Sequence, residues 1–289
     1  MRQKGLRLLC VLIGIIGFSL LVGESILFAD GPPSDLNRNF WQRPENISGD
    51  DSIDTIVDRT TYLLVFWYAI VVFCLVYFCL KYRAKEGQRG YYHHGTDAKS
   101  IGLQLLLGVT VFFSVDVHLV LLSSNHLQKT FYNYPKEDRN DLETLRVEVM
   151  PQQWAWNFRY AGPDHLFNTS DDILTFNELY IPKDRNVIFQ LKARDVIHSF
   201  SLPNTRLKQD AIPGSVTRMW FKSVKTGKFE IVCAEMCGLN HYKMKADMFV
   251  LEPKEFESWA KRAQKISAVS FDKDEPDSLW GWKWEAYNK

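Results

Sequence analysis

Residues 233–244 read Cys-Ala-Glu-Met-Cys-Gly-Leu-Asn-His-Tyr-Lys-Met, and this stretch says most about the chain. It sets two thiols, an imidazole and a thioether in the pattern C-x-E-x-C-x3-H-x2-M, and a second imidazole, His198, lies upstream in Asp-Val-Ile-His-Ser-Phe. Such soft and borderline ligands suit copper, but a mononuclear blue-copper site takes only one cysteine. The extra thiolate is explained if both sulfurs bridge two copper ions.

Two other interpretations of this motif stay open. Zinc takes cysteine and histidine ligands too, and a Cys233–Cys237 disulfide is plausible outside the cytoplasm. Zinc has no use for a thioether, however, and its usual patterns space paired Cys and His differently. Cys10, Cys74 and Cys79 lie in apolar segments, so the five cysteines do not form a disulfide framework. Copper is therefore the favoured metal.

The N-terminus predicts export. A basic start precedes an apolar run at residues 8–22, which is shorter than the about 20 residues of a spanning helix and typical of a signal peptide. We expect a signal peptide at residues 1–29 that ends at Ala29. Leu27 is not the small residue that a cleavage site prefers, so a retained anchor is the alternative. Residues 30–60 follow as a polar N-terminal segment.

Two longer apolar runs predict a transmembrane helical hairpin at residues 61–124, with helices at about 61–80 and 101–122. The connecting residues 81–100 carry more basic than acidic side chains, which places this loop in the cytoplasm. The C-terminal half then lies on the periplasmic side of a bacterial inner membrane, where a signal peptide would also lead. Asp116 and His118 interrupt the second run, and we expect them to face another protein or water rather than lipid.

The polar half predicts an all-β domain after the hairpin. Short β-branched or aromatic runs at 145–149, 186–191, 216–221, 228–232 and 246–251 favour a Greek-key sandwich or barrel. Pro253 opens a helix whose Phe256, Trp259, Ala260 and Ala263 share one face. The metal motif lies in a loop after residue 232, since ligands converge more easily there than on a strand.

Net charge and aromatic residues limit the kinds of partner molecule that we expect this chain to bind. The formal net charge of +1 gives no argument for nucleic-acid binding. Residues 161–180 carry four acidic side chains and no Lys or Arg, just after Gln153-Trp154-Ala155-Trp156. This arrangement fits an aromatic electron-input point beside a docking surface for a basic electron carrier; core tryptophans beside a solvated loop are the alternative.

On these residues, positions 50–262 resemble subunit II of the haem-copper cytochrome c oxidases. The match rests on C-x-E-x-C-x3-H-x2-M at 233–244, on Asp-Val-x-His-Ser around His198, and on Leu-Lys-Gln-Asp-Ala-Ile-Pro-Gly at 207–214. The resemblance implies a cupredoxin domain, placed at residues 140–262, and leaves 263–289 as a Trp-rich acidic tail.

The resemblance also implies roles for single residues. Cys233 and Cys237 would bridge two copper ions of a binuclear CuA centre. His198 and Met244 would complete one ion, and His241 and the Glu235 carbonyl the other. Trp154 would accept electrons from cytochrome c. The residues of this implied set are: Trp154, His198, Cys233, Glu235, Cys237, His241 and Met244.

The implied complex has further parts. Electrons would pass to haem in subunit I, where oxygen is reduced to water and protons are pumped, with subunit III and membrane lipid as further partners. Asp210 and Glu235 resemble neighbours of the family's magnesium site at the interface with subunit I.

Two departures from the family pattern matter. Ala155 stands between the tryptophans where the family usually has an aromatic residue. The family also commonly carries a glutamate just before the second helix, at the mouth of a proton channel, whereas Asp97 is the nearest acid in this chain. Either Asp97 takes that role or the proton entrance differs.

Three related functions fit the sequence less well. Quinol oxidases share the architecture but lack the copper ligands. Nitrous oxide reductase has a similar motif in a much longer soluble protein. A membrane-tethered copper carrier needs labile copper, which this closed ligand set argues against.

Overall fold

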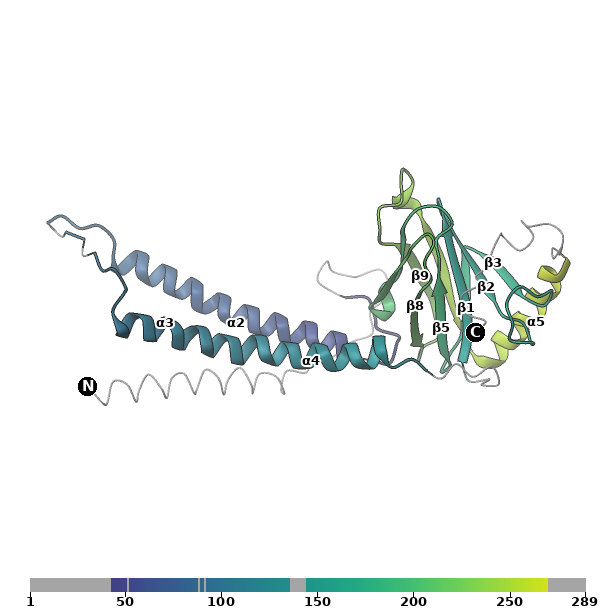
Figure 1. Ribbon diagram of the computed structural model, residues 1–289, viewed down its shortest axis with the longest axis horizontal. Helices are drawn as coiled ribbons and strands as arrows, with labels where there is room; N and C mark the ends of the chain where they lie inside the picture. The colour runs from purple at the N-terminus through teal and green to yellow at the C-terminus, as the bar shows by residue number, and fades with distance from the viewer. Residues whose placement is uncertain (1–42, 51, 88, 91, 136–143, 270–289) are drawn as a thin grey trace. The chain divides into compact units, whose positions relative to one another are not determined.

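The computed structural model describes residues 43–50, 52–87, 89–90, 92–135 and 144–269 (Figure 1). The expected signal peptide, the first part of the polar segment and the end of the Trp-rich tail lie outside the described residues. The chain divides into a helical unit and a β unit.

The helical unit contains two helices that are long and apolar enough to cross a membrane, which confirms this part of the predicted fold class. The first, α2 (Ser52–Lys81), begins nine residues before the predicted run. The second is continuous from Ala98 to Tyr132. Its parts are α3 (Ala98–Val111), a π-helical turn η1 (Phe112–Asp116), α4 (Val117–Leu127) and a π-helical turn η2 (Gln128–Tyr132).

The hairpin geometry sets the level of Asp116. Ser52 contacts the ring of His126, so these two residues mark one end of the antiparallel pair. At about 1.5 Å per residue, Asp116 lies about 15 Å from that level, and Thr61, where the charge-free run of α2 begins, lies about 14 Å from it. Asp116 is thus level with the end of that run nearest Ser52. What Asp116 and His118 face in a membrane stays a prediction.

The β unit is a sandwich of two five-stranded sheets, with strand orders β3-β2-β1-β5-β8 and β4-β10-β9-β6-β7. The β1–β5 and β4–β10 pairs are parallel, and the other neighbours are antiparallel. The strands are β1 (Thr144–Gln152), β2 (Ala155–Tyr160), β3 (Ile173–Phe176), β4 (Glu178–Pro182), β5 (Asn186–Leu191), β6 (His198–Leu202), β7 (Leu207–Ala211), β8 (Thr217–Lys222), β9 (Gly227–Cys233) and β10 (Lys245–Leu251).

Aromatic rings join the two sheets. Phe200 on β6 lies 5.3 Å from Trp156 on β2 and 5.5 Å from Phe189 on β5, measured between ring centroids. All three side chains are fully buried, so each contributes on the order of 2–3 kcal/mol of hydrophobic stabilisation. The core fixes the ends of β6 and β9, which carry two of the predicted ligands, His198 and Cys233.

Two further segments complete the β unit. Helix α5 (Pro253–Val269) packs its predicted face, with Phe256, Trp259, Ala260 and Ala263, against the core. Residues 43–50, expected as part of a polar lead-in, belong to the β unit as well. Ile47 is completely buried, and its backbone bonds Asn204 and Val224. One apolar residue in a polar segment was too weak a signal to predict this docking.

Candidate metal centre

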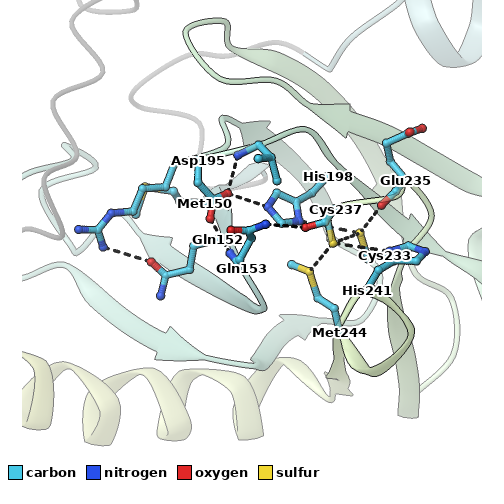
Figure 2. Close-up of polar contacts among 12 residues, drawn as sticks. Met150, Gln152, Gln153, Asp195, His198, Cys233, Glu235, Cys237, His241 and Met244 are labelled. Carbon is cyan, nitrogen blue, oxygen red and sulfur yellow. Dashed lines mark hydrogen bonds and ion pairs between the residues drawn. The ribbon is translucent and has the colours of Figure 1, made fainter. Parts of the chain in front are cut away.

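The predicted metal ligands gather at one end of the sandwich (Figure 2). Cys233 ends β9, and the loop that follows runs through η4 (His241–Lys243) to Met244, just before β10. His198 is the first residue of β6, which pairs with β9. This pairing brings together ligands that lie 35 residues apart in the chain.

Cys233 has an imidazole and a carbonyl oxygen beside it. Its Sγ lies 3.9 Å from Nδ1 of His198 and 3.2 Å from the backbone oxygen of Glu235. His198 is completely buried, whereas Glu235 is exposed. Because the Glu235 side chain points away from the sulfur cluster in Figure 2, its backbone is the group that can act as a ligand.

Cys237 has a matching pair of donors. Its Sγ lies 3.5 Å from Nδ1 of His241 and 3.7 Å from Sδ of Met244. The two cysteine sulfurs are 3.7 Å apart, and both cysteines are free. Two sulfurs, two imidazoles and two weak donors therefore converge here, which is the number of donors that two sulfur-bridged metal ions would require.

Backbone hydrogen bonds between residues of the loop hold it in this shape. The N–H of His241 donates to the carbonyl of Gly238 at 3.1 Å, and the N–H of Met244 donates to the carbonyl of His241 at 3.1 Å. The N–H of Cys233 donates to the carbonyl of Met244 at 3.2 Å, which closes the loop. Gly238 has φ +117°, a conformation that side chains disfavour, so glycine is required at this turn.

Asp195 orients the buried histidine. Its Oδ1 lies 2.9 Å from Nε2 of His198, and its carboxylate also accepts the backbone N–H groups of Gln153 and Val196. A proton on Nε2 satisfies this contact and leaves Nδ1 as the lone-pair donor toward Cys233. Such a carboxylate–histidine pair is the usual device for fixing a ligand tautomer.

The two thiols differ in acidity. Burial raises the pKa of Cys233, but hydrogen bonds to His198 and to nearby backbone groups outweigh it and lower this pKa to about 6. Burial and the adjacent Cys233 raise the pKa of Cys237 to about 12. Without a metal the pair therefore carries about one negative charge at neutral pH. A bound cation favours loss of the second proton as well.

The donor set fits copper better than the alternatives. A disulfide needs sulfur atoms about 2.05 Å apart, well below the separation seen here. A structural zinc site takes four ligands without a thioether, whereas Met244 is 1% exposed and aims its sulfur at Cys237. His198, Cys233 and Cys237 form the single cluster of metal-binding type within the described ranges. Two thiols, two imidazoles, a thioether and a carbonyl suit a copper pair.

Trp154 lies against this loop. A Cβ added to Gly238 would come 3.3 Å from Cζ2 of Trp154 and 2.8 Å from Nε2 of Gln153, so the missing side chain of Gly238 lets the ring approach. Trp154 is half-buried, while Ala155 and Trp156 are buried in the core. Of the two tryptophans, Trp154 is thus the one within reach of both solvent and the metal loop.

Two other predicted residues stand apart from this arrangement. Asp210 lies on β7 opposite Ser199 and accepts a bond from Thr217 through its backbone oxygen. Magnesium binding by Asp210 and Glu235 remains a prediction. Asp97 caps the N-terminus of α3 and accepts bonds from the N–H and hydroxyl of Ser100. These hydrogen bonds lower the pKa of Asp97.

Sequence reasoning missed Asp195 and Gln153. Asp195 stands in the motif around His198, and its position three residues before a ligand is the available signal. Gln153 gave no such signal, because its contact with Cys237 joins residues 84 positions apart.

Comparison with known proteins places this site in a family. Residues 145–250 match the model of the periplasmic domain of cytochrome C oxidase subunit II. The alternative cytochrome c oxidase subunit 2 of Bradyrhizobium diazoefficiens is 28% identical over 240 residues, which cover 75% of this chain and 82% of that protein. The chain belongs to the cytochrome c oxidase subunit II family.

Other relatives of this subunit II chain match over shorter stretches. The subunit 2 of Thermostichus vulcanus is 43% identical over 125 residues, which cover 43% of this chain and 35% of that protein. The chain therefore spans about a third of the length of that relative. The crystal structure of the periplasmic domain of subunit II from Bradyrhizobium japonicum has 32% sequence identity and a TM-score of 0.39, and covers 46% of this chain and 97% of that domain.

Family membership settles the broad setting. A subunit II is one component of a cytochrome c oxidase, so the oxidoreductase activity belongs to the complex. The two apolar helices and the periplasmic-type domain make this chain a membrane protein.

Proposed function

We propose that this chain takes electrons from cytochrome c at a binuclear CuA centre and passes them to haem in subunit I. There, oxygen is reduced to water and protons are pumped. The single observation that carries the proposal is the convergence of six donors: two facing cysteine sulfurs, with two imidazoles and two weak donors that each lie within 3.9 Å of a sulfur.

The protein's part is to hold a fixed shape. Copper, when bound, supplies a centre that takes up and releases one electron at a time. Cys233 and Cys237 would hold both ions, with His198 and Met244 on one and His241 and the Glu235 carbonyl on the other. The loop hydrogen bonds and the Asp195–His198 contact keep these donors in place, which keeps reorganisation small. No ligand position is left for a substrate.

Trp154 is the residue proposed to receive electrons from cytochrome c. It combines partial exposure with contact to the metal loop. The acidic stretch at 161–180 supports docking of a basic carrier in part: Asp164 and Glu178 are exposed, whereas Asp172 is 6% exposed and faces Arg159. Asp172 therefore belongs to the interior and not to the docking surface.

The remaining parts of the proposal concern the assembly. The helical hairpin would lie in the bacterial inner membrane with the β unit on the periplasmic side, in contact with subunits I and III. A magnesium ion near Asp210 and Glu235 would lie at the interface with subunit I. The excess of basic residues in the loop between α2 and α3 supports this orientation.

The test is a metal count with a spectrum. The purified protein, loaded with copper and dialysed against a mild chelator, should keep two copper ions per chain and show the electron paramagnetic resonance signal of a mixed-valence pair. One copper per chain, a zinc-filled colourless product, or copper lost in dialysis would each reject the proposal. The last result would favour a copper carrier.

A further inference from the structure

Gln153 joins three parts of the domain at the metal centre (Figure 2). It lies in the turn between β1 and β2, directly before Trp154. Its side-chain Nε2 donates to the backbone carbonyl of Cys237 at 2.8 Å, and its backbone N–H donates to Oδ2 of Asp195 at 2.7 Å. One residue thus contacts the thiolate loop and the carboxylate that orients His198.

The contact with the thiolate loop is closely fitted. Because Gly238 has no side chain, the amide of Gln153 and the ring of Trp154 both lie against the loop at that point. A methyl group at position 238 would come 2.8 Å from the Gln153 amide nitrogen, closer than such contacts normally occur. The Gln153–Trp154 turn therefore packs against the loop at a defined position, although Gln153 is an exposed residue.

The neighbouring Gln152 makes a useful contrast. Its Oε1 accepts a bond from Arg194 at 3.1 Å, on the other side of the strand, and no described contact ties its side chain to the metal loop. Two adjacent glutamines at the end of β1 thus share size, polarity and location. They differ in whether the side chain holds a ligand residue.

We propose that Gln153 is a positioning residue for electron uptake: its two hydrogen bonds lock the turn that carries Trp154 onto both ligand-bearing loops. The proposal rests on the function proposed above, because it assumes a copper pair and electron input at Trp154. The lock acts on the Trp154-to-metal contact rather than on metal binding itself. Loss of the side-chain bond to Cys237 loosens this lock, slows electron transfer and leaves the metal in place.

The experiment uses the assembled oxidase with the matched variants Gln153→Met and Gln152→Met. Cytochrome c already bound to the oxidase is reduced by a light flash, so the first-order rate of electron transfer excludes the encounter step. We expect Gln153→Met to slow this rate about tenfold, the lower end of the effect of residues that support metal ligands. Gln152→Met should stay within about twofold of the wild type. Trp154→Phe serves as the reference for a damaged input point.

Further readouts separate positioning from misfolding. Gln153→Met should keep two copper ions, the mixed-valence signal, the thermal unfolding midpoint and the KM for cytochrome c of the Gln152→Met control. Equal rates in the two variants would overturn the positioning role while leaving the copper centre established. A Gln153→Met protein that loses copper would also overturn it, since the residue would then act on the site itself. A wild type without the two-copper signal would remove the proposed function too.

Discussion

Two clusters of polar side chains in the β unit have opposite characters. In the metal loop, sulfur and imidazole atoms face one another at 3.5–3.9 Å, in the weak hydrogen bonds that sulfur makes. On the first sheet, Arg159 donates to Glu148 and Asn168 at 2.6 Å each and lies 3.8 Å from Asp172. Both clusters are largely buried, but one is complete and the other needs a further group.

The contrast separates structure from function. Buried charges that are paired and hydrogen-bonded are costly to break and inert when intact. Donors that converge through weak sulfur contacts are available to bind another group, and here the chemistry points to copper. The two sites therefore differ in the strength of their hydrogen bonds: the Arg159 cluster has short, strong ones and the metal loop has weak ones. Burial and charge do not distinguish them.

The largest effect should follow from removing a bridging thiolate. Cys233→Ser replaces the sulfur with a hydroxyl oxygen, a poor copper ligand, so the mixed-valence signal should vanish and turnover of the oxidase should fall by about 100-fold or more. Spectroscopy and oxygen consumption measure the two effects. Cys79→Ser, at an exposed free cysteine of α2, is the matched control and should change neither. A binuclear signal that survives in Cys233→Ser would show that this thiolate is not a copper ligand and would contradict the contrast between the two clusters.

The complete cluster should respond in stability instead. Arg159→Met leaves Glu148 and Asp172 buried without their cation, which should cost about 3–5 kcal/mol in the free energy of unfolding. Urea unfolding measures this loss, and the copper signal of the folded protein should be unchanged. Arg194→Met, at an exposed arginine of the same domain, should cost no more than about 0.5 kcal/mol.

A triple variant guards against a protein that does not fold. Combining Arg159→Met with Glu148→Gln and Asp172→Asn removes the uncompensated charges, so it should recover much of the lost stability. Should the single Arg159 variant unfold at the wild-type urea concentration, the cluster would have no structural role.

A second effect on the stability of this cluster concerns pH. Burial raises the pKa of Asp172 to about 7, despite the lowering effect of Arg159, while an unfolded aspartate titrates near 3.8. The folded state thus binds the proton more tightly. The stability that Asp172 contributes is complete below pH 4 and is lost as the pH rises through 7. Each pH unit between the two pKa values is worth about 1.4 kcal/mol.

Asp172→Asn should flatten this part of the stability profile. The amide is neutral at every pH, so the free energy of unfolding should fall less between pH 4 and pH 7 than in the wild type. Asp164→Asn, at an exposed position in the same loop, is the control and should keep the wild-type slope. Identical slopes in Asp172→Asn and wild type would show that the carboxyl is ionised throughout.

The metal loop could be predicted from the sequence, whereas the Glu148–Arg159 cluster could not. Cys233, Cys237, His241 and Met244 lie in one short stretch of unusual composition, so their joint role was predictable. Glu148 and Arg159 looked like ordinary charged residues, because their pairing depends on the register of β1 against β2. Only the sheet shows that they are directly opposite each other.

The same reasoning explains the strand predictions. The runs that became β1, β5, β8, β9 and β10 were found because β-branched and aromatic residues stand between clear turn residues. Strand β2 is not among the predicted strands, since Trp154-Ala155-Trp156 at its start is interpreted as an electron-input point. All six residues of β2 are buried, because one face meets the core and the other meets the Glu148–Arg159 cluster.

The smallest expected effect tests a carboxylate of a third kind, one that is exposed and already satisfied by its own helix. Asp97 caps α3 through Ser100, and Nε2 of His93 lies 3.3 Å from its carboxylate. Since the hydrogen bonds from Ser100 lower the pKa of Asp97, the carboxylate is charged throughout the physiological range. If it serves as the proton entrance, it attracts protons by its charge and does not store them.

Asp97→Asn isolates that charge, because asparagine is an equally good helix cap. Turnover should slow by a factor of about two to ten, less than the 10²-fold typical of a group that transfers the proton itself, and the factor should be the same from pH 6 to pH 8. Glu86→Gln removes a charge from the same loop and should leave turnover unchanged. Wild-type turnover and proton uptake in Asp97→Asn would reduce Asp97 to a helix cap. A carboxylate whose hydrogen bonds are already complete would then have a structural role at the surface, just as it has in the buried Glu148–Arg159 cluster.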